Sequence, residues 1–519
     1  MPAFRETRGR HRLAGAAAIM MASFILSRLT GLGRDMAISY EFGTSPELAS
    51  YLAAFRLPDF LFQLLAGAAL ASAFIPTFAR YQASGEEREA WALTSSLLNL
   101  IGLFTLVLSL ATMAAAPWIV PRIFFGFDPE HQELTVRLTR IMLASPVFFG
   151  VSAILGSALN ARRRFLLPGL APIVYNLSIA VGALVLSPRI GIEGLAWGVA
   201  AGALCHLLVQ APGLRHEGMV YRLTLSFSHP GVREVARLMG PRVLGLAAVQ
   251  VNFLVTTILA STLDPSSLPA LNYGWLLTLL PLGIFGVAIS NAVFPTMAAE
   301  AARDSGESMG RTLYGTLRMI LFLTVPASVG LVALGQPLIA LLFQRGRFDA
   351  FSVEATYGAL VFYAVGLFGH GMVEILTRAF YAVQDTRTPV AIGVGSMAVN
   401  VALSLVLMGP LGYGGLALSV SLAVIVEAFL LLGMMRKRLV RTAPPGVGVS
   451  AGRTCLASAL MGVAILVFRL WIPVPPAGLD LAAFVVAGVV MGVLVYFFAA
   501  YSLGSQEARL LRSNFALKR

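Results

Sequence analysis

Three arginines and one aspartate lie inside the first apolar segments of the chain. Arg28, Arg34 and Asp35 fall within the first hydrophobic segment, and Arg56 follows early in the second. A charged side chain near the bilayer centre costs roughly 2.5–3.5 kcal/mol on insertion scales, so such residues normally face a protein interior or a water-filled cavity. A guanidinium presents a planar fork of donors that suits phosphate oxygens. The four residues therefore indicate an anion-binding cavity within a membrane.

The composition predicts that membrane-spanning helices position these residues. Of 519 residues, 57% are hydrophobic and only 12% are charged, and the mean hydropathy is +0.80. These values are typical of a polytopic membrane protein and exclude a soluble domain. Basic loops explain the net charge of +13 better than a nucleic-acid partner does. Cys205 and Cys455 lie far apart in apolar stretches, so we expect no disulfide framework, metal site or cofactor.

A spanning helix needs about 20 mostly apolar residues, which predicts an all-α polytopic membrane protein with about fourteen transmembrane helices. The first apolar run continues through Arg28 and Arg34 without a convincing cleavage site, so we interpret it as a retained span. The expected spans are 13–40, 50–79, 91–118, 138–160, 169–187, 191–212, 236–260, 270–299, 312–335, 355–383, 388–409, 413–435, 453–472 and 480–503.

The distribution of basic residues predicts the orientation. With both termini in the cytoplasm, the loops and tails on that side hold about 24 Lys and Arg, and Arg162, Arg163 and Arg164 form one cluster. The opposite side holds about five. The positive-inside rule therefore favours cytoplasmic termini and an even number of spans. We interpret the arginine cluster as a topology signal that also contacts anionic membrane lipids.

The chain repeats itself at a nearly constant spacing. The segment 71–79 resembles 290–298, and Phe127-Asp128 recurs as Phe348-Asp349. In a third match, Pro168 is followed by Gly194-Leu195-Ala196, and Pro389 is followed at the same distance by Gly415-Leu416-Ala417. Parallel repeats of this kind are a known transporter plan, with the substrate site between the lobes near the midplane. The predicted organisation is an N-terminus at 1–12, an N-lobe at 13–212, a cytoplasmic linker at 213–235, a C-lobe at 236–435, a cytoplasmic loop at 436–452, spans thirteen and fourteen at 453–503 and a tail at 504–519.

Several motifs resemble one known family. The stretch from Ser27 to Asp35 reads SRLTGLGRD, residues 55–59 read FRLPD, and residues 73–76 read AFIP. Further matches are PIVYN at 172–176, GPR at 240–242, PLG at 281–283, RGRFD at 345–349 and RAFYAVQDTRTP at 378–389. Together they are similar to the MurJ (MviN) lipid II flippase family of the multidrug/oligosaccharidyl-lipid/polysaccharide exporter superfamily, and the similarity covers nearly the whole chain.

The resemblance implies a transporter and not an enzyme. It implies transport by alternating access of lipid II, the undecaprenyl-pyrophosphate-linked disaccharide-pentapeptide, from the inner to the outer leaflet of the bacterial cytoplasmic (inner) membrane. The expected role is in peptidoglycan synthesis, cell wall biogenesis and cell shape. Arg28, Arg34 and Arg56 would hold the diphosphate, Asp35 would orient a neighbouring arginine, and Ser27 belongs to the same substrate-binding motif.

The chain departs from the family pattern at four positions. Ala49 and Gly67 stand where acidic residues are expected, and Gln63 and Leu276 stand where arginines are expected. These differences predict a less cationic cavity than is usual in the family. They leave open which lipid-linked substrate the chain takes.

Other polar residues within the spans are candidates for ion or proton coupling. Side-chain oxygens of Asn252, Thr256 and Asn400 could receive a coupling cation, although interhelical hydrogen bonds are the commoner use of such residues. Glu427 could titrate, and His370 could relay a proton. Glu374 and Arg378, four residues apart on one helix, are expected to form a structural pair. The energy source stays open between a coupling cation and the membrane potential.

Two further classes of function remain as alternatives. One is an exporter of the same superfamily that carries another lipid-linked oligosaccharide or an organic cation, although a cation would call for acidic residues where the first lobe has arginines. The other is a membrane scaffold without transport, or a membrane enzyme. The loops contain no His/Asp, Cys/His or acidic metal-binding constellation, which argues against catalysis.

Overall fold

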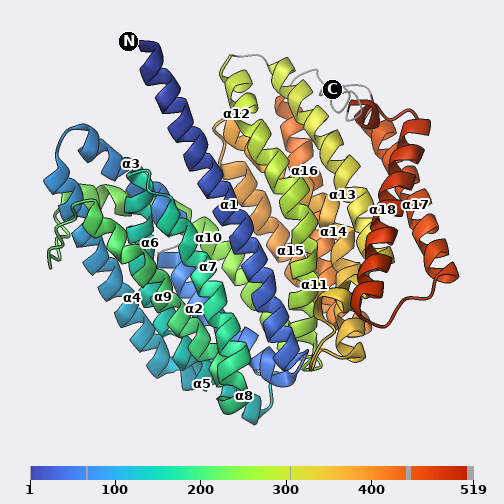
Figure 1. Ribbon diagram of the computed structural model, residues 1–519, viewed down its shortest axis with the longest axis horizontal. Helices are drawn as coiled ribbons and strands as arrows, with labels where there is room; N and C mark the ends of the chain where they lie inside the picture. The colour runs from blue at the N-terminus through green and yellow to red at the C-terminus, as the bar shows by residue number, and fades with distance from the viewer. Residues whose placement is uncertain (1, 66–67, 304–305, 440–445, 511–519) are drawn as a thin grey trace. The chain divides into compact units, whose positions relative to one another are not determined.

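The computed structural model describes residues 2–65, 68–303, 306–439 and 446–510, and every regular element in these ranges is helical (Figure 1). The elements are α1 (Pro2–Phe42), α2 (Pro46–Leu65), α3 (Ala68–Ala83), α4 (Glu87–Ile123), α5 (Pro129–Met142), α6 (Ala144–Ala161), α7 (Leu166–Val181), η1 (Gly182–Leu186), α8 (Ser187–Ile190), α9 (Glu193–His216), α10 (Pro230–Ser261), α11 (Ser267–Pro281), η2 (Leu282–Val287), α12 (Ala288–Ala302), α13 (Gly306–Phe343), α14 (Ala350–Ala382), α15 (Arg387–Leu411), α16 (Tyr413–Arg438), α17 (Val447–Trp471) and α18 (Gly478–Ser502).

Eleven helical segments of the described residues are long and apolar enough to cross a membrane. They correspond to eleven of the expected spans. The other three expected spans, 13–40, 50–79 and 236–260, coincide with α1, with α2 and α3, and with α10. The fold class, an all-helical polytopic membrane protein, is therefore confirmed, and the count of fourteen spans stays a prediction.

The first compact unit comprises the residues up to Pro265 together with Arg345–Arg347. Within it α1 packs on α7, α6 packs on α9, and α2 packs on α5 and α10. One core of this unit lies where α3, α4 and α6 meet, around the buried side chains of Phe74, Phe78 and Trp91. This unit holds all five charged residues of the first two predicted spans, which are Arg28, Arg34, Asp35, Arg56 and Asp59.

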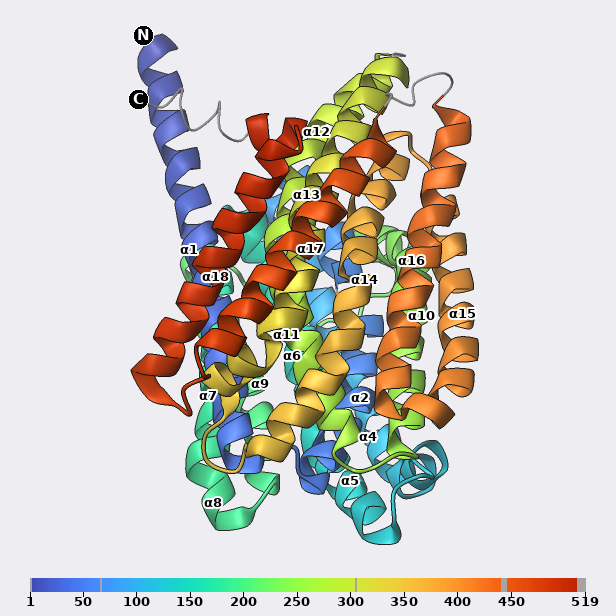
Figure 2. The ribbon, with the colours of Figure 1, turned by 90° about the vertical axis from the view of Figure 1, so that its right-hand side faces the viewer.

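The second compact unit comprises Ser266–Gln344 and the residues from Phe348 onward. Its central helix is α14, which packs on α11, α13 and α16. The pair α17 and α18, adjacent in Figure 2, packs on α13, where the Tyr496 hydroxyl donates to the Phe322 carbonyl at 2.6 Å. The contact-defined units do not coincide with the predicted lobes, since α10 and Arg345–Arg347 belong to the first unit, and α17 and α18 belong to the second.

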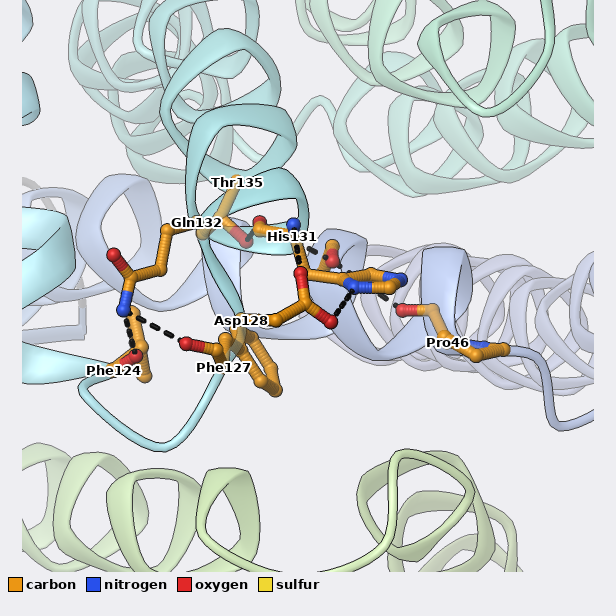
Figure 3. A network of polar contacts seen from close by, with 8 residues as sticks. Pro46, Phe124, Phe127, Asp128, His131, Gln132 and Thr135 are labelled. Carbon is orange, nitrogen blue, oxygen red and sulfur yellow. Dashed lines mark hydrogen bonds and ion pairs between the residues drawn. The ribbon is translucent and has the colours of Figure 1, made fainter.

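Helix starts recur at the repeat spacing. Asp128 precedes α5 and accepts a hydrogen bond from the backbone N–H of His131 at 2.9 Å, while His131 Nδ1 lies 2.7 Å from its other oxygen (Figure 3). The hydrogen bond from the His131 backbone is the main reason that the pKa of Asp128 lies below its ordinary value, and the bond from the His131 side chain adds to this effect. Asp349, the equivalent residue of the second copy, accepts from the backbone N–H of Ser352 at 2.8 Å before α14. Both aspartates satisfy an orphan N–H of the first helical turn.

Turn conformations recur at the same spacing. Gly191 (φ 64°, ψ −153°) precedes α9, and Gly412 (φ 54°, ψ −136°) precedes α16. Arg163 and Gln384 both have φ 60°, a left-handed conformation that is uncommon for residues other than glycine. Each pair has the same separation along the chain as Asp128 and Asp349. The repeat seen in the sequence therefore extends to the backbone geometry of the connections.

One ion pair recurs with its charges exchanged. After α6, Arg164 Nε lies 2.6 Å from Glu217 Oε1 at the end of α9. After α14, Asp385 Oδ2 lies 2.5 Å from Arg438 Nη2 at the end of α16. Both members of the second pair follow their counterparts at the repeat spacing. The two turns thus use the same contact with opposite polarity.

Candidate functional site

Arg34 lies at the centre of a polar cluster between α1 and α7. Its Nε and Nη2 donate to Asp35 Oδ1 at 2.9 and 2.8 Å, and its Nη1 donates to Asn176 Oδ1 at 3.1 Å. Asn176 in turn donates to the backbone carbonyl of Ser27 at 3.3 Å. Asp35 is buried, whereas the side chain of Arg34 is 28% exposed. The cluster fixes the guanidinium in one orientation and leaves part of it accessible.

Arg28 lies outside this cluster, although it belongs to the same helix. Its side chain is exposed, and the guanidinium carbon lies 5.3 Å from the ring centroid of Phe24 on the preceding turn. Residues six apart on an α-helix point in different directions, whereas residues seven apart share a face. Arg28 therefore projects from a different side of α1 than Arg34.

Arg56 and Asp59 of α2 both contact α10. Arg56 Nε donates to Thr257 Oγ1 at 2.9 Å, and its guanidinium carbon lies 5.5 Å from the centroid of Phe253. One turn further along α2, Asp59 Oδ2 accepts a hydrogen bond from Gln250 Nε2 at 2.8 Å. These contacts join α10 to the rest of the first unit. They give Arg56 a structural partner on a neighbouring helix.

The departures from the family pattern lie in different environments. Ala49 is 1% exposed, so an acidic side chain there would be buried. Gln63 and Leu276 are half-buried. Gly67 lies outside the described residues.

The candidate coupling residues fall into separate groups. Thr256 donates to the backbone carbonyl of Asn252 at 3.0 Å within α10. In the second unit, Asn400 is buried on α15. The carboxylate of Glu427, which belongs to α16, lies beside Gly393 of α15. The described residues hold no group of three or more His, Cys, Asp and Glu side chains that could hold a metal ion.

His370 and the pair Glu374 with Arg378 lie on α14. The His370 ring packs against Trp275 of α11, with centroids 5.2 Å apart. Arg378 forms a charged hydrogen bond with Glu374, so the expected pair is confirmed. Arg378 also donates to Asn291 of α12 at 2.9 and 3.1 Å. The pair therefore holds α12 against α14.

Some polar partners were not singled out from the sequence. Asn176 and Asp59 lie within matched motifs, but neither motif indicates which helix its side chain contacts. His206 is the counterpart of Glu427 in the first copy, and its Nδ1 lies 2.7 Å from Ser152 Oγ on α6. Gln210 donates to the same hydroxyl at 2.7 Å. The repeat spacing is the signal that could have found His206, because it places one ionisable side chain at the same position in each copy.

Comparisons with solved structures define the class of protein. A structure described as lipid II flippase MurJ in an inward closed conformation superposes with a TM-score of 0.79 and 25% identity, covering 93% of this chain and 98% of that one. An inward-facing MATE family transporter of the MOP superfamily superposes with a TM-score of 0.69 at 16% identity, covering 82% and 98%. The chain is thus a multi-pass helical membrane protein with the fold of MOP-superfamily transporters.

Sequence comparisons define the family. The model of the family described as lipid II flippase MurJ matches residues 38–475. The lipid II flippase MurJ of Burkholderia cenocepacia is 30% identical over 501 residues, covering 94% of this chain and 97% of the relative. The probable lipid II flippase MurJ of Bdellovibrio bacteriovorus is 32% identical over 518 residues, covering 97% and 98%. This chain belongs to the MurJ lipid II flippase family of bacterial membrane proteins, as its motifs predicted.

Proposed function

We propose that this protein is a flippase that moves lipid II from the inner to the outer leaflet of the bacterial cytoplasmic membrane. The observation that carries the proposal is the state of Arg34. Three of its five N–H groups bind Asp35 and Asn176, and two have no partner among the described residues. An oriented, partly exposed guanidinium in a spanning segment is suited to a diphosphate oxygen. Family membership supplies the substrate.

The proposed transport needs no covalent step, so the protein acts as a transporter and not as an enzyme. The charged diphosphate and the sugar-peptide head of lipid II cannot cross hydrocarbon without replacing their hydrogen bonds to water. Arg34 and Arg56 would supply substitute donors in a cavity that opens alternately to the two sides. Arg28, which projects from another side of α1 in this structure, would join them in a different conformation of the transporter. Asp35 would limit the net charge of this cavity, and the segment from Ser27 to Asp35 would form part of the cavity wall. The polyprenyl tail would remain in lipid.

Arg56 would have to serve two partners. In this structure its Nε binds Thr257, and its guanidinium lies over Phe253. A diphosphate could replace the threonine hydroxyl, because a charge-assisted hydrogen bond is roughly twice as strong as one between neutral groups. We infer that substrate binding changes the contact between α2 and α10. This would couple the occupied site to a helix movement.

The proposed orientation places both termini, the linker 213–235, the loop 436–452 and the tail 504–519 in the cytoplasm. The bias of Lys and Arg toward these segments supports it. The proposed lobes are 13–212 and 236–435, as the repeat indicates. Cysteine labelling at positions 163 and 346 should report opposite sides of the membrane, and labelling from one side would overturn this orientation.

Glu427 and His206 are the proposed coupling residues at the equivalent position of the two copies. Each is an ionisable side chain beside polar groups of a neighbouring helix, and intramembrane ionisable residues commonly serve ion or proton pathways. Asn400 lies on the helix that Glu427 faces. Asn252, Thr256 and His370 remain further candidates for this role, and the membrane potential is the other proposed source of energy.

One alternative cargo is favoured by a specific observation. Ala49, Gln63 and Leu276 supply none of the charges expected at their positions, which fits an exporter of another lipid-linked oligosaccharide. An organic cation is disfavoured, because the carboxylate of Asp35 is already neutralised by Arg34.

Complementation tests the proposed function directly. A bacterium depleted of its own flippase should grow when it expresses this chain and should fail when it expresses Arg34→Ala at equal membrane abundance. Arg189→Gln, which removes an exposed arginine of α8 outside the polar cluster of Arg34, serves as the matched control. Growth failure of the unmodified chain, with normal abundance, would favour the alternative cargo. Growth of Arg34→Ala would contradict the role of the arginine.

A further inference from the structure

A segment that follows α9 is attached along α4. Asn99 of α4 donates to the backbone carbonyls of Arg222 and Thr224 at 3.0 and 2.9 Å and accepts from the Tyr221 hydroxyl at 2.5 Å. The backbone N–H of Arg222 donates to Ser95 Oγ at 3.2 Å. These bonds satisfy polar side chains of a spanning helix with main-chain groups of the segment. The segment 219–224 is therefore held in place along α4.

A cleft of about 380 Å³ lies under this segment. Leu98 of α4, Leu155 of α6 and Leu214 of α9 line its inner wall, and all three are buried. Met219 and Tyr221 of the attached segment close its outer side. The volume is within the range of small-molecule sites, roughly 300–1,000 Å³. Such an apolar lining suits a hydrocarbon chain.

The cleft continues an apolar stripe on α9. Leu204 and Leu208 of this helix are exposed, and Ala211 and Arg215 follow them at spacings of three and four residues, so all four share one face. Ala211 and Arg215 line the cleft. Exposed leucines on a spanning helix face lipid, so the lipid-facing surface leads directly into the cleft.

Arg215 is the charged residue of the cleft. It lies in the last turn of α9, and its side chain is exposed. In the described part of the chain its guanidinium has no acidic partner. A cation at a helix end beside an apolar cleft complements a ligand that has an anionic head and an acyl chain.

We propose that this cleft binds a membrane phospholipid with an anionic head group, with one acyl chain between α4, α6 and α9 and the phosphate on Arg215. A free phosphate would leave the apolar walls in contact with water, which is unfavourable in proportion to their area. A phospholipid satisfies both the walls and the arginine. The site lies within the first unit and is independent of the proposed transport function.

Native mass spectrometry of the full-length chain in a delipidating detergent tests this site. The probes are phosphatidylglycerol, phosphatidylcholine and inorganic phosphate, each titrated separately. We expect phosphatidylglycerol to bind most tightly and inorganic phosphate not to displace it. Arg215→Gln should weaken phosphatidylglycerol binding about tenfold, because it removes a charge-assisted hydrogen bond. Displacement by inorganic phosphate at a similar concentration would overturn the lipid assignment.

Two further variants separate the head group from the acyl chain. Ala211→Phe places a ring in the cleft and should weaken both phospholipids, whereas Arg189→Gln should leave both unchanged. An Arg215→Gln variant that binds phosphatidylglycerol as the Arg189→Gln control does would show that the phosphate lies elsewhere. Unchanged binding in Ala211→Phe would show that no acyl chain occupies the cleft. Matching gel-filtration profiles of the variants establish that they are folded.

Discussion

The two copies of the repeat agree at their connections and differ within their first spans. Helix caps, glycine turns and an ion pair recur at one constant spacing. At the 219-residue spacing that relates 71–79 to 290–298, the second copy has Ala247, Phe253, Leu254 and Trp275 in place of Arg28, Arg34, Asp35 and Arg56. The connections are constrained by the fold, because each must end one helix and begin the next. The charges are not required by the fold, so they indicate what the first copy does specifically.

The largest expected effect concerns Arg34. Arg34→Ala should lower flipping by at least about 100-fold, because it removes more than one charge-assisted hydrogen bond to the diphosphate, each contributing roughly 1.5–3 kcal/mol. Arg34→Lys should recover only part, since an ammonium cannot reproduce the planar fork. The measurement is lipid II translocation in proteoliposomes.

The second copy supplies the matched control for this variant. Val255→Ala truncates an apolar side chain of α10, two residues beyond the position equivalent to Arg34, and should leave flipping nearly unchanged. Equal losses in the two variants would show that the copies contribute alike, and the comparison between them would fail.

The next effect concerns Arg56. Arg56→Gln should weaken lipid II binding about tenfold, because fewer arginines remain here than in a chain with the full family set. Leu276→Arg, which supplies an arginine where the family pattern has one, should restore part of the loss. A binding titration on the single and double variants measures both effects.

Thr257→Val separates the structural role of Arg56 from its role in binding. This variant removes the hydrogen bond from Arg56 to α10 but keeps the charge, so it should bind lipid II at least as well as the unmodified chain. If Thr257→Val weakens binding as much as Arg56→Gln does, the arginine acts through α10 and not on the substrate.

A smaller effect is expected at the shared turns. Gly191→Ala and Gly412→Ala should each lower the free energy of unfolding by about 1–3 kcal/mol, because both glycines have backbone angles that other residues adopt only with strain. Thermal unfolding in detergent should show similar shifts for the two variants. A loss at only one glycine would mean that the copies use these turns differently.

The smallest expected effect concerns the pH dependence of stability at Asp385, which belongs to one of the two charge-exchanged ion pairs. Hydrogen bonds from the Thr388 side chain and backbone, aided by Arg438, lower the pKa of Asp385 to about 2. A carboxyl whose pKa is lower in the folded protein than its unfolded value of about 3.9 stabilises the fold above that pH and loses this contribution as the pH falls toward 2. The melting temperature should therefore fall less steeply between pH 4 and pH 2 in Asp385→Asn than in the unmodified chain. Identical slopes would show that the Asp385 carboxylate contributes nothing to stability in this pH range.

The sequence predicted the fold better than it predicted the contacts of the site. Apolar runs of spanning length identify helices directly, because a bilayer fixes their length and composition. The motif from Ser27 to Asp35 identified Arg34 and its neighbour Asp35. It could not identify Asn176, whose contact spans 142 residues of sequence and depends on how α1 packs on α7.

Arg28 and Arg56 illustrate the same limit of a local pattern. Both are arginines in predicted spans, yet Arg28 is exposed beside Phe24, whereas Arg56 binds Thr257 on a helix 201 residues away. The environment of each arginine depends on how its helix packs against others, and this packing cannot be predicted from the neighbouring residues in the sequence. The exchange of charges between the two turns was equally hidden, because opposite residues at equivalent positions reduce the apparent similarity.

The charge-exchanged turns also bear on how the chain assembles. Correct pairing joins Arg164 with Glu217 in one copy and Asp385 with Arg438 in the other. If a nascent helix end paired with the wrong copy, Arg164 would meet Arg438 and Asp385 would meet Glu217, and both contacts would repel. A chain built from two similar halves risks such exchange while its helices insert. Opposite polarity at the same turn penalises the wrong partner, so each half recognises its own helices by charge.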